Sequence, residues 1–349
     1  MPQNQTERGE AARAMYRLLA GGWVAQIIHT AAELGLADHF GEEARDVASL
    51  ASATATHPPS LWRLLRALAA IGVVHETQDS RYTLTSLGAT SRTDQPGSMR
   101  ALARFLLGDE MARTWRALPH TVRTGDIGFR HAFGTDSRSY LATHPEFATL
   151  FNTAMLSGTQ GIDAEIGAHY PFGNFGWIVD VGGGIGTLLL PILDRHPEMR
   201  GTIFELPHVV VQARERVAAA GLAARCDAVE GDALITIPAG ADAYLMKFVL
   251  HNRTDDEAVA ILHNCHHAMP AHAKLLIMER VLPDRVDPDD PRSRANVLVD
   301  INMMLMSPGG RERTEVEHRQ LLKQAGLQIE RIVPTASPLA IIQAALATP

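Results

Sequence analysis

The chain has 349 residues, of which 46% are hydrophobic and 20% are charged, a composition that indicates about two globular domains and excludes wholesale disorder. Its 32 Lys and Arg against 39 Asp and Glu give a net charge of −7, which argues against nucleic acid or an anionic membrane as a partner. Two cysteines are too few for a disulfide framework. Because the N-terminus lacks a signal pattern and no apolar run reaches the roughly 18 residues of a membrane span, we expect a soluble, cytoplasmic protein.

The first half of the sequence is predicted to be mainly helical. Gly35 indicates the end of the first apolar-periodic stretch, and Ser60 is the expected N-cap of a later amphipathic helix. The predicted elements are helices over 10–40, 45–55 and 61–68, strands over 73–75 and 82–84, and further helices over 99–167. Helices followed by a hairpin are typical of a winged-helix unit.

From residue 177 onward, strands and helices alternate. The predicted strands are 177–181, 201–204, 226–230, 243–248, 273–279, 327–334 and 339–345, and the predicted helices are 187–195, 209–220, 256–268, 297–306 and 315–325. Alternation of this kind favours an α/β domain built on a Rossmann-like, doubly wound sheet with mainly parallel strands. We therefore expect two domains, a helical and winged-helix domain over 1–168 and an α/β domain over 169–349.

A glycine-rich turn follows the first strand of the α/β half. It has the spacing D-x-G-x-G-x-G from Asp180, and Gly182 and Gly184 allow the backbone to turn sharply and to approach a ligand closely. The dehydrogenase fingerprint would require glycine at 187, where Thr187 stands. The spacing therefore favours S-adenosylmethionine over a nicotinamide cofactor, because no pyrophosphate has to lie on the helix N-terminus. Taken alone, the turn could equally be structural.

Acidic residues follow the next two predicted strands. Glu205 ends the second strand, where its carboxylate can accept hydrogen bonds from both ribose hydroxyls. Gly231, Asp232 and Ala233 end the third strand, where an aspartate suits the adenine amino group. Because ligands of such folds bind beyond the carboxyl ends of the strands, the three loops are expected to converge on one crevice.

Further motifs make the sequence resemble the S-adenosylmethionine-dependent O-methyltransferases of the plant caffeate and flavonoid type and their bacterial antibiotic-tailoring relatives. The resemblance covers nearly the whole chain and includes L-L-R-A-L at 64–68, T-V-R-T-G at 121–125, F-N-T-A-M at 151–155, L-M-K-F-V-L-H at 245–251, M-E-R at 278–280 and G-G-R-E-R-T at 309–314. It implies an N-terminal dimerisation domain followed by a class I methyltransferase domain, and it implies that the protein forms a homodimer. It also implies S-adenosylmethionine as donor, S-adenosylhomocysteine as product and no metal.

The resemblance also implies the roles of several residues. His251 matches the general base of the family, and Glu279 and Glu312 match the two glutamates that bracket it. Lys247 matches a position near the methionine moiety of the cofactor, and Gly182, Glu205 and Asp232 match the loop, ribose and adenine positions. Independent chemistry supports the base, because a phenol with a pKa of about 10 is a poor nucleophile at pH 7 and imidazole, with a pKa of about 6.5, can accept its proton.

The sequence departs from the family directly after the predicted base. The family usually continues His-Asp-Trp, whereas this chain has His251-Asn252-Arg253. Asn252 can still donate and accept hydrogen bonds, but it carries no charge. The change leaves the prediction for His251 in place and alters the expected contacts of the acceptor and of the adenine.

The resemblance places an aromatic acceptor among apolar residues of both halves. The expected pocket residues are Trp115, Phe151, Met155, Asn252, Asp300, Met303 and Met304. The methionines and aromatics could instead be ordinary core residues. The family and the composition point to a tricyclic or polycyclic natural-product phenol, such as a phenazine, anthraquinone or anthracycline, as in antibiotic and secondary metabolism.

Other functions remain as alternatives. His263 and His267 are one helical turn apart, a spacing compatible with metal ligands, although a solvated helix is the simpler reading. A ligand-sensing regulator could use the winged helix on DNA, but the first 100 residues hold nine Arg, no Lys and ten acidic residues. A third alternative is methyl transfer to nitrogen or to an N-hydroxyl by positioning alone.

Overall fold

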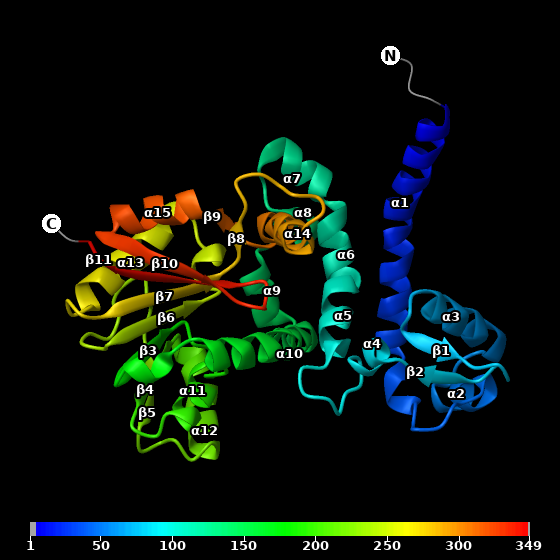
Figure 1. The fold of residues 1–349 in the computed structure, drawn as a ribbon, viewed down its shortest axis with the longest axis horizontal. Helices are drawn as coiled ribbons and strands as arrows, with labels where there is room; N and C mark the ends of the chain where they lie inside the picture. Colours follow the sequence, from blue (N-terminus) through cyan, green and yellow to red (C-terminus); the bar gives the residue numbers. More distant parts are fainter. Residues whose placement is uncertain (1–4, 348–349) are drawn as a thin grey trace. The chain divides into compact units, whose positions relative to one another are not determined.

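The computed structural model describes residues 5–347, which form two compact units. The first unit comprises the chain up to Ala112 together with 141–159, and the second comprises 113–140 and the chain from Gln160 onward (Figure 1). This division differs from the single boundary at 168 that the sequence predicts, because residues 113–140 pack with the second unit. Gly128 there lies so close to the C-terminal helices that a Cβ atom would come within 2.4 Å of Leu305.

The N-terminal elements follow the predicted winged-helix order. They are α1 (Gln5–Glu33), η1 (Leu36–His39), α2 (Val47–Ala53), α3 (Pro58–Ala70), β1 (Val74–Glu76), β2 (Tyr82–Leu84) and α4 (Ser86–Ala89), and β1 pairs with β2 in antiparallel fashion. The prediction of Ser60 as an N-cap is wrong, since α3 begins two residues earlier, after His57. Pro58 and Pro59 fix φ near the helical value and need no amide partner in the first turn.

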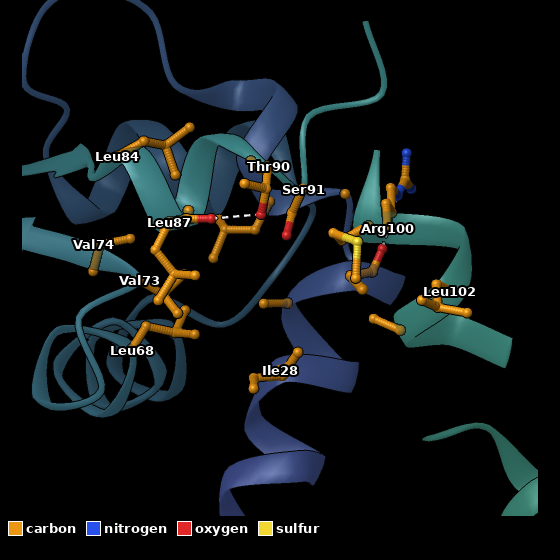
Figure 2. A pocket seen from close by; sticks show the side chains of 18 of the residues that line it. Ile28, Leu68, Val73, Val74, Leu84, Leu87, Thr90, Ser91, Arg100 and Leu102 are labelled. Atoms are coloured by element: carbon orange, nitrogen blue, oxygen red, sulfur yellow. Dashed lines mark hydrogen bonds between the residues drawn. The ribbon is translucent and has the colours of Figure 1, made fainter. Parts of the chain in front are cut away.

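A cavity of about 300 Å³ lies inside the first unit. Its wall is almost wholly apolar and is built from separate elements, with Ile28 on α1, Leu68 on α3, Leu84 on β2 and Leu102 on the helix that begins at Met99 (Figure 2). The next helices are α5 (Met99–Leu107), α6 (Asp109–Arg116), α7 (Leu118–Thr124), α8 (Gly128–Phe133), α9 (Ser137–Thr143) and α10 (Pro145–His169). No helix within residues 5–347 is both long and apolar enough to cross a lipid bilayer.

The second unit is built on a seven-stranded sheet with the strand order β10-β11-β7-β6-β3-β4-β5. The strands are β3 (Trp177–Val181), β4 (Arg200–Glu205), β5 (Cys226–Glu230), β6 (Ala243–Lys247), β7 (Lys274–Glu279), β10 (Leu327–Pro334) and β11 (Ala340–Leu346). Strands β3 to β7 run parallel, and β10 and β11 form an antiparallel hairpin beside β7. The predicted doubly wound, mainly parallel sheet is confirmed.

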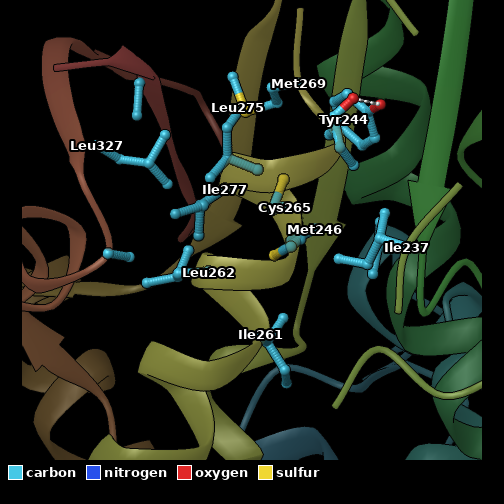
Figure 3. Close-up of a cluster of buried hydrophobic side chains, with 14 of the residues drawn as sticks. Ile237, Tyr244, Met246, Ile261, Leu262, Cys265, Met269, Leu275, Ile277 and Leu327 are labelled. Carbon is cyan, nitrogen blue, oxygen red and sulfur yellow. Dashed lines mark hydrogen bonds between the residues drawn. The ribbon is translucent and has the colours of Figure 1, made fainter. Parts of the chain in front are cut away.

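Helices cover both faces of this sheet (Figure 1). They are α11 (Leu189–Arg195) and α12 (Pro207–Ala219) on one face and α13 (Asp255–Ala268) and α15 (Glu315–Gln324) on the other. Alternate residues of β7 enter the two cores. Leu276 and Met278 pack in the core with α11. Leu275 and Ile277 pack in the core with α13 (Figure 3). This period of two follows from the pleat of a strand, which directs successive side chains to opposite faces of the sheet.

One small sheet was not predicted. Strand β8 (Val281–Leu282) pairs in parallel with β9 (Arg313–Thr314), and α14 (Pro291–Met306) connects them. Helix α14 begins at Pro291, because the Asp290 carboxylate caps it by accepting hydrogen bonds from the amides of Arg292 and Ser293. This arrangement brings the segment before β9 beside the carboxyl end of β7.

Candidate active site

The glycine-rich turn and Glu205 meet at the carboxyl ends of β3 and β4. Gly182 and Gly184 have φ angles of 68° and 56°, in the left-handed region that favours glycine. The amide of Gly184 donates to Oε2 of Glu205 at 3.0 Å, and the amide of Leu206 donates to Oε1 at 2.7 Å. The Glu205 carboxylate therefore holds the turn, and each oxygen keeps a lone pair for a further donor.

The end of β5 lies beside the end of β4, as predicted. The amide of Gly231 donates to the Glu205 carbonyl at 3.0 Å, and a Cβ atom at 231 would lie 2.4 Å from the Phe204 ring, so only glycine fits. Asp232 accepts a hydrogen bond from the Leu234 amide at 2.9 Å, and the Ala233 carbonyl accepts one from Asn264 at 2.8 Å. The three loops thus converge on one edge of the sheet.

Lys247, at the end of β6, forms an ion pair with Asp163 of α10. Asp163 is 3% exposed, and its Oδ2 atom is buried without a hydrogen-bond partner in the described part of the chain. The nearby Asp180 is also buried, and burial raises its pKa to about 7 although Lys247 acts in the opposite direction. Asp163 was not predicted as a site residue, because a single acidic residue on a long helix belongs to no recognisable motif.

The imidazole of His251 is paired with Glu312. His251 lies on η3 (Leu250–Asn252), and its Nδ1 atom is 3.1 Å from Oε1 of Glu312. Both side chains are buried, with His251 8% and Glu312 1% exposed. A carboxylate on Nδ1 fixes the tautomer that carries hydrogen there and makes Nε2 the basic nitrogen. Among the described residues, Nε2 has no hydrogen-bond partner.

Glu279 holds the backbone of the histidine segment and makes no hydrogen bond to the ring. Its Oε1 atom accepts from the amides of Leu250 and His251 at 2.7 and 3.0 Å. Burial raises the pKa of the Glu279 carboxyl, and His251 acts in the opposite direction. The two glutamates expected to bracket the base are therefore brought to it, but only Glu312 contacts the imidazole.

The G-G-R-E-R-T segment closes the site from the other side. The Arg311 amide donates to the His251 carbonyl at 2.9 Å, and Asp300 of α14 accepts from the Glu312 amide at 2.8 Å. The Arg313 guanidinium is 1% exposed and donates to the carbonyl of Leu250 at 2.9 Å, and it also pairs with Asp255. The clamp made by Arg313 was not predicted, because the family resemblance gives a role in this motif only to Glu312.

Phe248 has the most unusual backbone in the site. Its φ of 56° lies in the left-handed region, a strain of about 1–3 kcal/mol for a residue other than glycine. Its ring stacks on the His251 imidazole with centroids 5.2 Å apart. Its carbonyl accepts from Asn252 at 3.2 Å, and Ser307 donates to Asn252 at 3.4 Å. Asn252, which replaces the family's aspartate, thus links the histidine segment to the end of α14.

The predicted acceptor residues are brought together only in part. Asp300, Met303 and Met304 lie on one side of α14, whose Asp300 contacts the Glu312 backbone. Trp115 lies on α6 in the second unit and is 36% exposed. The remaining two, Phe151 and Met155, lie in the part of α10 that belongs to the first unit, and a place for them in the pocket stays a prediction.

The histidine cluster on α13 shows no metal geometry. The ring centroids of His263 and His267 are 6.4 Å apart. Within residues 5–347, no group of three His, Cys, Asp or Glu side chains is placed to hold a metal ion.

Comparison with known proteins identifies the family. Residues 115–328 match the model of the O-methyltransferase domain, and residues 16–94 match that of the O-methyltransferase dimerisation domain. The chain is 38% identical over 330 residues to the phenazine O-methyltransferase PhzM of Lysobacter antibioticus, covering 95% of each chain.

Two solved structures carry the same fold with ligands. The first is CalO1, a methyltransferase of calicheamicin biosynthesis with S-adenosylhomocysteine bound, at a TM-score of 0.87 and 32% identity, covering 97% of this chain and 99% of that chain. The second is NcsB1, an O-methyltransferase of neocarzinostatin biosynthesis with S-adenosylmethionine and 2-hydroxy-5-methyl naphthoic acid, at a TM-score of 0.74 and 31% identity, covering 93% and 96%. The chain belongs to the family of S-adenosylmethionine-dependent O-methyltransferases.

Proposed function

We propose that this enzyme methylates a hydroxyl group of a polycyclic aromatic acceptor and that His251 is its general base. The observation that carries the proposal is the buried pairing of His251 Nδ1 with Glu312, which leaves Nε2 to take the hydroxyl proton. Glu279 fixes the backbone of the same residue through two amide hydrogen bonds. Glu312 and Glu279 are thus positioning residues, one for the ring and one for the main chain.

The cofactor edge has the properties that S-adenosylmethionine requires. Apart from its own chain neighbours, no described residue comes within 4 Å of the Cβ position at Gly184, and the Glu205 carboxylate beside it retains acceptor capacity for ribose hydroxyls. The buried, unpartnered Oδ2 of Asp163 can accept from the amino group of the methionine moiety, next to Lys247. When bound, S-adenosylmethionine supplies a methyl group on a sulfonium, which is a good leaving group.

The protein's contribution to the reaction is proton removal and alignment. His251 would take the proton of the acceptor hydroxyl while that oxygen bonds to the methyl carbon, the bond from this carbon to sulfur breaks and S-adenosylhomocysteine leaves. The proton then resides on Nε2, and Glu312 stabilises the resulting imidazolium across Nδ1. Phe248 and Glu279 restrict movement of the imidazole and its backbone, so that the acceptor oxygen meets the methyl group in line.

The acceptor class follows from the relatives and from α14. Relatives at 31–38% identity act on phenazine and naphthoate rings, and Asp300, Met303 and Met304 offer a mixed polar and apolar wall beside Glu312. We assign Asn252 to the rim of this wall and Trp115, which belongs to the same unit, to the acceptor site. A flat ring of two or three fused cycles suits flexible methionine side chains.

We further propose that the enzyme works as a homodimer through its dimerisation domain. Several large apolar side chains of α1 are at least 57% exposed, among them Leu18, Leu19 and Trp23. An apolar face of this kind on a helix needs a cover. Light scattering should give twice the chain's mass, and L18K/L19K should lower it. A monomeric wild type that methylates its acceptor would contradict the dimer.

The methyl-transfer proposal is tested by a product screen. Wild type is incubated with S-adenosylmethionine labelled on its methyl group and with a panel of hydroxylated phenazines, naphthoates and anthraquinones, and product masses are measured. We expect one class to gain a single labelled methyl group on oxygen, and E205A to lose most of that activity. Methylation only of amines would contradict O-methyl transfer, and failure to bind S-adenosylhomocysteine would contradict the cofactor assignment.

A further inference from the structure

Polar atoms without partners cluster where β7 meets α14. Nε of Arg280, Oδ1 of Asn296 and Oε2 of Glu312 are all buried and have no hydrogen-bond partner within residues 5–347. Folded proteins rarely leave such atoms unsatisfied, and the exceptions concentrate where a ligand or water binds. The proposed methyl transfer involves Glu312, but it involves neither Arg280 nor Asn296.

Arg280 and His251, the proposed general base, both contact the ring of Phe248. Arg280 directly follows Glu279 at the carboxyl end of β7, and its guanidinium lies over the Phe248 ring at 5.6 Å from the centroid. The same ring stacks on His251 at 5.2 Å. The charge of Arg280 is therefore fixed at the end of the sheet where the acceptor hydroxyl must be deprotonated.

Among the residues that the structure describes, no carboxylate forms an ion pair with Arg280. Burial lowers the pKa of its guanidinium, although Glu312 acts in the opposite direction from beyond ion-pair distance. Arg313 is the useful contrast, since its buried guanidinium is satisfied by Asp255 and by two backbone carbonyls. Arg313 is thus a structural clamp, whereas the unpaired guanidinium of Arg280 incurs a desolvation cost that an anionic ligand would offset.

Asn296 of α14 is the second residue with an unpartnered buried atom. Its side chain is 2% exposed, and its amide nitrogen donates to the Val281 carbonyl, next to Arg280, at 3.5 Å. Asp300 lies one helical turn further on, and Met303 and Met304 lie two turns further on, so all four share one side of α14. Asn296 therefore lies on the same side of α14 as the proposed acceptor wall.

We propose that Arg280 and Asn296 form a subsite that binds a carboxylate on the aromatic acceptor, with a hydroxyl or amino group beside it. This rests on the proposed methyl transfer and names the acceptor class as hydroxy- or amino-substituted aromatic acids. Arg280 donates charge-assisted hydrogen bonds to the carboxylate, and Oδ1 of Asn296 accepts from the neighbouring hydroxyl or amino group. The carboxylate is bound and not methylated, and the hydroxyl near His251 receives the methyl group.

The test compares matched acids and esters. We would measure kcat/KM of wild type for 1,4-dihydroxy-2-naphthoic acid and its methyl ester, and for a hydroxyphenazine carboxylic acid and its methyl ester. We expect each acid to be preferred, and R280M to lower kcat/KM for the acids by about 10–100-fold and for the esters by less than about threefold. R280K should retain part of the preference. R285M, at an exposed arginine five residues away, is the matched control and should leave the ratio unchanged.

Two kinds of result would contradict the carboxylate subsite. An unchanged acid-to-ester ratio in R280M, or equal losses for acid and ester, would overturn it. So would a wild type that binds S-adenosylhomocysteine and methylates uncharged phenols but none of the acids. The proposed function fails separately, if no phenol of any kind is methylated. Affinity for S-adenosylhomocysteine verifies that each variant is folded, and R280K replaces R280M in the comparison if R280M does not bind it.

Discussion

Nδ1 of His251 and Oε1 of Glu312 lie 3.1 Å apart and join two segments that are 61 residues apart in the chain. The contact depends on both sides of the site. Glu279 holds the histidine backbone, and Asp300 holds the Glu312 backbone. An imidazole anchored in this way presents a single basic nitrogen in a single direction, which is what removal of a hydroxyl proton requires.

Replacing Glu312 by glutamine should distinguish the electrostatic role of its carboxylate toward the His251 imidazole from a role of the side chain in packing. The Gln side chain has the same shape, but it cannot stabilise the imidazolium with a full charge and can hold the wrong tautomer. We expect E312Q to lower kcat by about 10²–10⁴ with little change in cofactor affinity, the range associated with loss of acid–base function. E315Q, at a partly exposed glutamate three residues further on that pairs with Arg319, serves as control. Steady-state kinetics that leave E312Q within threefold of wild type would show that the carboxylate is dispensable.

Valine at Gly184 should prevent cofactor binding. The residue has a φ of 56° and donates its amide to Glu205, and a β-branched side chain opposes that backbone conformation and fills the open space in front of it. Gly221 supplies the control, because its φ is 70° with open space at the Cβ position but it lies outside the site. Calorimetric titration with S-adenosylhomocysteine should show loss of binding in G184V and unchanged affinity in G221V. Equal affinities in the two variants would move the cofactor elsewhere.

Removal of the Glu205 carboxylate should weaken cofactor binding by about 1.5–3 kcal/mol, the range for a hydrogen bond to a charged group. The loss combines the ribose contact with loosening of the turn, since the same carboxylate holds the Gly184 amide. E205D keeps the charge and should lose less than E205A. Identical dissociation constants for wild type and E205A would place the ribose contact at another residue.

Asp180 should make the stability of the protein fall as pH rises. Its carboxyl has a pKa of about 7 in the folded protein, against an ordinary value of 3.8, because it is buried. The folded state therefore holds the proton more tightly than the unfolded state, and stability is lost as pH rises through the interval from about 4 to 7. D180N cannot ionise, so its Tm relative to wild type should be higher at pH 8 than at pH 4.5. A difference that is constant with pH would show that Asp180 is already ionised in the folded protein.

Much of the second unit could be predicted, because its signals are local. Strands β3 and β5 and the hairpin of β10 and β11 are continuous apolar or alternating runs with turn residues at their ends, and their predicted bounds agree with the structure to within one residue. The glycine-rich turn and Glu205 could also be placed together, since parallel strands end at the same edge.

The parts that were missed depend on contacts between distant segments. Strands β8 and β9 are two residues long, and nothing in either sequence marks them until α14 brings them together. The different contacts of Glu279 and Glu312 arise from backbone geometry at the ends of two strands, which a spacing cannot reveal. Phe248 reads as the last residue of a strand, and its left-handed backbone is imposed by the turn into η3.

The central claim, that His251 is the general base of O-methyl transfer, is tested most directly by the kinetics of H251A. Rates would be measured across a pH series on two hydroxylated acceptors of different acidity. We expect kcat to fall by about 10²–10⁴ with S-adenosylhomocysteine affinity intact, less for the more acidic acceptor, and to recover as pH approaches each acceptor's own pKa. A defect below about threefold for both acceptors, or one that is equal for both at every pH, would contradict the claim and leave alignment alone as the source of catalysis.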